Sequence, residues 1–189
     1  LLVSCFNNVE GIKITGNMFI GNIYNNYLNA ASSLSNNIII SSTTALFIRD
    51  NIGGSIYGNI CRGNIYQNNC NRISFNICSS ILSNTSSGVI DGNICGSISG
   101  NIVSNITNNT IRGMANSRNI SSNTVTNITG NTCERIQSNT NRKEIKFNSN
   151  NGEISFINMS GFSIDSNINN GSIVTTPLSA NITDTIVNK

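Results

Sequence analysis

Isoleucine recurs along most of the chain at intervals of four or five residues, with polar residues between. From Ile94 the apolar positions step by four, four, four and five to Ile111, and a similar beat, with Thr at two steps, leads from Ile128 to Ile145. A spacing of four also fits one face of a helix, but Asn, Ser, Thr and Gly are weak helix formers. The pattern therefore predicts short β-strands, each with one large residue facing inward, and about four sides to each repeating unit.

A longer period organises the shorter one. The tripeptide Asn-Ile-Cys recurs at 59–61, 76–78 and 93–95, an interval of 17 residues. Two columns at this period are Ile60, Ile77, Ile94, Ile111, Ile128, Ile145 and Phe162, and Ser87, Ser104, Ser121, Ser138, Ser155 and Ser172. Such an interval is typical of a solenoid, whose rungs stack about 4.8 Å apart around a narrow core. We predict an all-β fold, a single-chain β-solenoid (parallel β-helix) of roughly ten rungs of about 17 residues, with the isoleucine column inward.

Composition agrees with this fold. The 189 residues include 38 Asn, 32 Ile and 27 Ser, whereas charged residues make up 10% and proline occurs once. Asn tolerates left-handed backbone at a corner, and its amide can bond along the axis to the Asn of the neighbouring rung. An Asn just before an inward Ile is therefore expected to be a corner residue.

Two stretches resemble known repeat families. Residues 7–22, which read NNVEGIKITGNMFIGN, resemble the repeats of right-handed parallel β-helix proteins, the pectate-lyase-like and phage tail-spike group. The Gly-Asn-Ile stretches at 58–67 are also similar to pentapeptide-repeat proteins, which we rank second. The first resemblance implies a parallel β-helix. Its glycan-cleaving members use paired carboxylates.

The repeat also suggests a domain organisation. Residues 1–176 are expected to be solenoid, more regular from about residue 56 and richer in charge and Phe from about residue 141. Pro177 stands where the 17-residue register ends, so 177–189 are expected to be a cap or a linker to a following domain. Because the chain begins at Leu1 without a Met, we expect it to be a piece of something longer.

The sequence contains no recognisable catalytic motif. The absence of His excludes Ser-His-Asp and Cys-His nucleophilic sites and the usual mixed zinc sites. The acidic residues fall in six different columns of the 17-residue register, so no two stack on adjacent rungs; those compared are Asp50, Asp91, Glu134, Glu144, Glu153 and Asp165. We therefore predict no catalytic residue, cofactor or metal site, and no enzymatic activity in this chain.

The six cysteines are expected to be packing residues. None forms a C-x-x-C pair, and the chain is large enough to fold without disulfides. Cys61, Cys78 and Cys95 share a column at the 17-residue period, which predicts stacked thiols.

Function follows only weakly from these patterns. A dispersed net charge of +3 does not favour a nucleic-acid partner, and no membrane insertion is expected because no apolar stretch approaches the roughly 18 to 20 residues that a membrane helix needs. Outward residues with binding potential are Tyr57, Tyr66, Arg118 and Arg135, a candidate ligand surface.

The leading hypothesis is a structural and attachment segment of an extracellular fibre, a phage or viral appendage or a surface adhesin. Its partners would be itself, as a homotrimer, and surface glycans, and its location extracellular or on a virion. The alternatives are a fragment of a polysaccharide lyase or hydrolase with its active site elsewhere, and an ice- or crystal-surface-binding solenoid.

Overall fold

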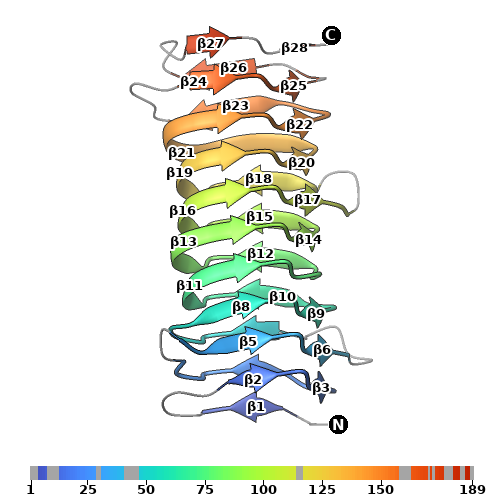
Figure 1. Cartoon of the computed structure of the whole chain (residues 1–189). Helices are drawn as coiled ribbons and strands as arrows, with labels where there is room; N and C mark the ends of the chain where they lie inside the picture. The colour runs from blue at the N-terminus through green and yellow to red at the C-terminus, as the bar shows by residue number, and fades with distance from the viewer. Residues whose placement is uncertain are drawn as a thin grey trace.

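The protein is a parallel β-solenoid, which confirms the predicted fold class. The computed structural model describes residues 4–7, 13–28, 31–40, 47–113, 117–157, 163–169, 171, 173–176, 181–183 and 186–187. Within these ranges the chain contains strands and turns but no helix, and hence no helix able to cross a membrane. The rungs stack one on the next into a rod with the chain ends at opposite ends (Figure 1).

The strands lie on three flanks, and on each flank a strand pairs in parallel with its counterparts on the neighbouring rungs. Flank A contains β3 (Met18–Phe19), β6 (Ile38–Ile39), β9 (Ile60–Cys61), β14 (Ile94–Cys95), β17 (Thr110–Ile111), β20 (Thr132–Cys133), β22 (Ser149–Asn150), β25 (Ile168–Asn169) and β28 (Ile186–Val187). Flank B contains β1 (Cys5–Phe6), β4 (Ile23–Tyr24), β7 (Phe47–Arg49), β10 (Asn64–Tyr66), β12 (Ser80–Leu82), β15 (Ser97–Ser99), β18 (Asn119–Ser121), the start of β21 (Arg135–Lys146), β23 (Ile154–Ile157) and β26 (Ile173–Thr176). Flank C contains β2 (Ile14–Thr15), β5 (Ser33–Ser35), β8 (Ser55–Tyr57), β11 (Asn69–Ser74), β13 (Thr85–Asp91), β16 (Ile102–Thr107), β19 (Thr124–Thr129), the end of β21, β24 (Ser163–Asp165) and β27 (Asn181–Thr183).

Flank C explains why the sequence beat suggests four sides. Its longer strands carry two inward residues separated by an irregularity, as in β16, where Val103 and Ile106 are both buried. The register of neighbouring strands shifts at this point, for example between Ser86 and Val89. A rung therefore has four inward positions on three flanks.

The core is a set of axial columns of branched side chains. On flank B and flank C the inward position is Ile on nearly every rung, and the side chains are almost fully buried. Stiff β-branched side chains lose little rotamer freedom in such a stack and pack directly on their equivalents one rung away. The flank B column comprises Ile23, Ile48, Ile65, Ile81, Ile98, Ile120, Ile136 and Ile154, and the flank C column Ile14, Leu34, Ile56, Ile73, Ile90, Ile106, Ile128, Ile145 and Ile164.

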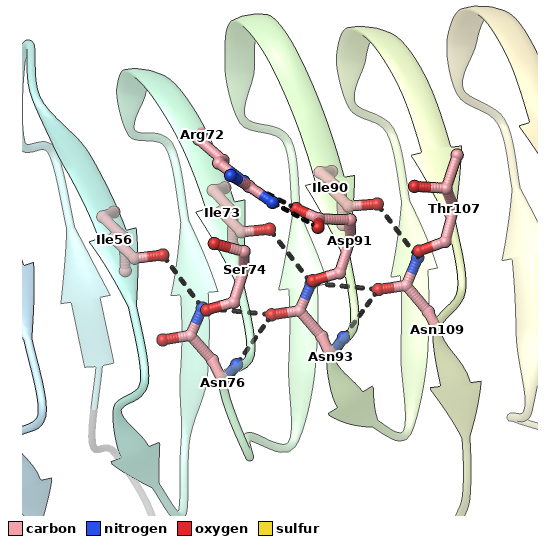
Figure 2. Close-up of polar contacts among 10 residues, drawn as sticks. All are labelled: Ile56, Arg72, Ile73, Ser74, Asn76, Ile90, Asp91, Asn93, Thr107 and Asn109. Atoms are coloured by element: carbon pink, nitrogen blue, oxygen red, sulfur yellow. Dashed lines mark hydrogen bonds and ion pairs between the residues drawn. The ribbon is translucent and has the colours of Figure 1, made fainter.

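Buried asparagines form the corners, as predicted, but the residue after such an Asn faces outward, as Ile60, Ile77 and Ile94 do, and not inward as expected. The Nδ2 of Asn93 donates to Oδ1 of Asn109 on the next rung at 2.9 Å and to the carbonyl of Ile73 at 3.0 Å (Figure 2). Its Oδ1 accepts the backbone N–H of Asn76 at 2.9 Å. Each amide thus satisfies backbone groups that a turn would otherwise leave unpaired inside the rod. One ladder comprises Asn17, Asn37, Asn59, Asn76, Asn93, Asn109, Asn131, Asn148 and Asn167, and the other Asn26, Asn51, Asn68, Asn84, Asn101, Asn123 and Asn139.

A left-handed residue precedes each ladder Asn. At the corner of Asn93 it is Gly92, with φ of 62°, and the equivalent residue one rung earlier is Phe75, with φ of 54°. Glycine adopts this conformation without cost, whereas a bulky side chain is strained there. A Cβ on Gly92 would also lie 2.6 Å from the Phe75 ring, so a larger residue at position 92 requires that ring to move.

The predicted inward column at the 17-residue period is wrong for its first three members. Ile60, Ile77 and Ile94 face outward with 40 to 47% of their surface exposed, and the cysteine that follows each of them is buried. The reason is that rungs are not uniformly 17 residues long. The ladder step from Asn93 to Asn109 is 16 residues, so Ile94 pairs with Thr110, and Ile111 pairs with Cys95. A slip of one residue moves a side chain to the opposite face of a strand.

Variable rung length also breaks the predicted serine column. Ser104 lies on flank C, but Ser121 lies on flank B, because the ladder step from Asn101 to Asn123 is 22 residues. The acidic residues Glu144 and Asp165 lie near one lysine on adjacent rungs but are not register partners, since Glu144 pairs with Ser163 and Asp165 with Lys146. Lys146 Nζ lies 3.0 Å from Glu144 and 3.7 Å from Asp165.

The cysteine prediction is confirmed. Cys61, Cys78 and Cys95 are buried thiols in one flank A column.

Toward the C-terminal end, β27 and β28 lie in the segment expected to be a cap or linker. They pair with β24 and β25 as further strands of flanks C and A. Phe162 and Ser172 lie outside the described residues.

Candidate ligand-binding surface

The four residues singled out in the sequence do not form one surface. Tyr57 is at the end of β8 on flank C, and Tyr66 is at the end of β10 on flank B. Arg118 and Arg135 lie at the start of flank B strands, but β12 and β15 separate them from Tyr66 along the rod. Each of these side chains therefore has to be considered in its own surroundings.

Tyr57 is exposed and hydrogen-bonded within its own flank. The hydroxyls of Ser35 and Ser33 donate to its phenolic oxygen, and these bonds lower the pKa of Tyr57. Ser35 is also the register partner of Tyr57 on the preceding rung. The rest of this outward column is small or polar, with Ser74 on the next rung, so Tyr57 is an isolated aromatic residue.

The two arginines sit close together, but acidic groups accompany them. Arg118 Nε lies 3.7 Å from Glu134, and the backbone N–H of Glu134 donates to the Arg118 carbonyl at 2.8 Å. Arg135 pairs in register with Asn119, one position away from Arg118. The side chain of Arg135 lies over Gly152, where an added Cβ would be 2.8 Å from its Cγ. Arg118 and Arg135 are therefore not register partners, and the residue next to Arg118 on the following rung is the acidic Glu134.

Tyr66 belongs to a cluster that crosses four consecutive strands of flank B. Its ring centroid is 5.6 Å from that of Phe47, which is 6.3 Å from Tyr24, and Tyr24 stacks on Phe6 at 5.3 Å. Arg49 lies among these rings, with its Cζ 4.6 Å from the centroid of Phe47. We call Phe6, Tyr24, Phe47, Arg49 and Tyr66 the aromatic–arginine cluster.

The alternation of the strands explains why these side chains meet. Ile23, Ile48 and Ile65 point into the core, so the residues on either side of them point outward. In-register pairing then places Phe6, Tyr24, Arg49 and Tyr66 in one outward column. Planar rings and a guanidinium at the spacing of one rung make favourable edge-to-face and cation–π contacts.

The cluster is partly exposed to solvent, and its one positive charge is paired with a carboxylate. Phe6 is 50% exposed, and Tyr24, Phe47 and Tyr66 are half-buried by their neighbours in the column. Arg49 forms an ion pair with Asp50 at 3.4 Å, so the guanidinium is partly neutralised while it covers the rings. The result is a band of flat apolar faces with one cation, on a backbone that the ladder holds rigid.

Sequence reasoning identified Tyr66 but missed the other four members of this cluster. The signal is present in the sequence as an aromatic residue or Arg directly after, or just before, an inward Ile in the first rungs. A fixed 17-residue period hides it, because the ladder step from Asn26 to Asn51 is 25 residues. Only the pairing of β4 with β7 brings Tyr24 and Arg49 together.

Two further groups of charged side chains form ion pairs on flank C. Arg72 on β11 donates two hydrogen bonds to Asp91 of the next rung (Figure 2). Nε donates to Oδ1 at 2.9 Å, and Nη2 donates to Oδ2 at 2.5 Å. This bond raises the pKa of Arg72, and the Glu144 carboxylate raises the pKa of Lys146. Within the described ranges, no three His, Cys, Asp or Glu side chains lie together as metal ligands would.

Comparison with known proteins returns no relative. No family model matches the chain, and neither the curated proteins nor the solved structures contain a significant match. The resemblance to tail-spike β-helices is therefore one of fold.

Proposed function

We propose that this chain is a structural and attachment segment of an extracellular fibre, such as a phage or viral appendage or a surface adhesin, and that its aromatic–arginine cluster binds a surface glycan. The observation that carries the proposal is the cluster itself, a band of rings and one guanidinium fixed on the flank of a stiff rod. An elongated stack of rungs is suited to present a binding face on its flank.

A glycan fits this surface better than a protein partner does. Sugar rings have apolar C–H faces that pack on aromatic rings and hydroxyl edges that need hydrogen-bond partners. The cluster offers rings next to polar groups, since Asn64 and Ser80 occupy the register positions that follow Phe47 on later rungs. Arg49 supplies charged donors for a hydroxyl or an acidic group.

Binding is tested with immobilised neutral and acidic polysaccharides and purified protein. The test variant is Tyr24→Ser with Tyr66→Ser, because Ser99 and Ser121 occupy the same outward column and show that the fold accepts serine there. The matched control is Tyr57→Ser on flank C, where Ser35 and Ser74 are the register partners. We expect at least a tenfold loss of glycan affinity for the double variant and no change for the control.

The outcomes separate the alternatives. Binding that depends on Tyr57 rather than on Tyr24 and Tyr66 would move the site to flank C and refute the role of the cluster. Shortening of the polysaccharide during incubation, followed by size-exclusion chromatography, would favour a lyase or hydrolase. No binding to any glycan would contradict the attachment function.

A further inference from the structure

Flank A carries a row of exposed apolar side chains that neither the core nor the cluster explains. In-register pairing joins Met18, Ile38, Ile60, Ile77 and Ile94 on five consecutive rungs, each 36 to 47% exposed. We call these five residues the Met/Ile row. Ile20 and Ile40 lie beside its first two members and are 46% and 36% exposed. Figure 1 shows β3, β6, β9 and β14 one above another along this flank.

The fold does not require an apolar residue at this position. The same outward column continues with Thr110, Thr132 and Ser149 on the next three rungs, where the strands of flank A pair in the same way, before Ile168 follows at 50% exposure. Packing between neighbouring rungs accounts for the part of each isoleucine that is buried. It does not account for five successive apolar residues where Thr or Ser serves equally well.

The row is large enough for a specific contact. With these exposures, the seven apolar side chains present on the order of 500 Å² of apolar surface, in the range of roughly 300–600 Å² of the largest apolar patch of a monomer, which is often functional. A standard interface buries about 800 Å² on each partner, and the polar positions at the edges of the flank would supply the remainder.

The chemistry of the row selects its partner. Its five members carry no charge and no hydrogen-bonding side chain, which disfavours glycans and nucleic acids. Their spacing is set by the stacking of rungs, and a second copy of the chain has the same spacing. We infer that the Met/Ile row is the face on which two copies of this chain pack side by side, with branched side chains of one row between those of the other. This self-association is independent of glycan binding by flank B.

The test measures mass in solution against protein concentration. The variant Ile60→Thr, Ile77→Thr, Ile94→Thr extends the polar part of the column across the row. The matched control is Ile52→Thr with Ile102→Thr, two isoleucines of one flank C column that are 45% and 57% exposed and are separated by Asn69 and Thr85. A third variant, Ile77→Lys, places like charges opposite each other at the centre of the interface.

Sedimentation equilibrium gives the expected results. The parent and the control should rise from the monomer mass of 20.2 kDa toward an oligomer over the same concentration range. The triple variant and Ile77→Lys should dissociate at least tenfold more readily, with circular dichroism unchanged. A parent that is monomeric at every concentration would overturn the inference, as would unchanged association of folded Ile77→Lys. Thermal hysteresis by a monomeric parent, lost in the triple variant, would assign the row to an ice surface instead.

Discussion

The asparagine ladder is expected to contribute more to stability than its exposed counterparts, and Asn93→Ala tests this. Asn93 is 1% exposed. Its side chain donates hydrogen bonds to Ile73, Asp91 and Asn109 and accepts one from Asn76. Substitution leaves the buried backbone N–H of Asn76 without its acceptor, which costs about 1–3 kcal/mol. Loss of the Nδ2 bonds to Ile73 and Asn109 costs about 1 kcal/mol each. We expect a total near 4 kcal/mol, a large share of the stability of a typical domain.

Urea denaturation at 25 °C, followed by circular dichroism, measures this loss. The matched control is Asn69→Ala, because Asn69 is an exposed flank C residue whose register partner is Thr85. The control should stay within about 0.5 kcal/mol of the parent. Hydrogen exchange adds a local measure, since the amide of Asn76 should exchange faster in Asn93→Ala and at the parent rate in the control. Equal stability of the two variants would refute the role of the ladder.

Three further predictions concern the faces, a corner and the thiols. Ile98→Asp buries an unpaired carboxylate in the core and should abolish the cooperative thermal transition, whereas Ile94→Asp at the exposed position should leave the protein folded. Phe75→Asn relieves a strained left-handed residue that is 61% exposed and should raise the unfolding free energy by about 0.5–1 kcal/mol, a gain that urea denaturation would detect. Burial raises the pKa of Cys70 from 9.0 to about 12, so the stability held by its protonated thiol is complete below pH 9 and falls as the pH rises toward 12. Cys70→Val should flatten the decline of the urea midpoint between pH 9 and 11, and an unchanged slope would contradict this cause.

The architecture was predictable because its signals are local. Asn before a branched residue, Gly or Asn at corners and the Asn-Ile-Cys repeat indicate a solenoid without knowledge of which residues pair. Free, stacked cysteines followed from the same repeat, and Cys61, Cys78 and Cys95 are indeed buried on one flank.

The facing of side chains was not predictable from a fixed period. Ile94 and Ile98 are four residues apart and both are flanked by small residues, but one is 40% exposed and the other is fully buried. Both lie on one rung: Ile94 directly follows the ladder residue Asn93, whereas Ile98 is the middle residue of β15, and a fixed period does not distinguish these two positions. The same uncertainty hid the aromatic–arginine cluster, because Tyr24 and Arg49 are 25 residues apart and pair directly.

The facing of the isoleucines is the claim on which both proposed surfaces depend, and solvent relaxation of methyl groups measures it directly. Protein labelled at the Ile δ1 methyl groups is studied by nuclear magnetic resonance with a neutral gadolinium chelate, at a concentration where it is monomeric. We predict strong relaxation for Ile60, Ile77 and Ile94 and protection for Ile65, Ile81 and Ile98. Protection of the first set equal to that of the second would place the flank A isoleucines in the core and contradict the account.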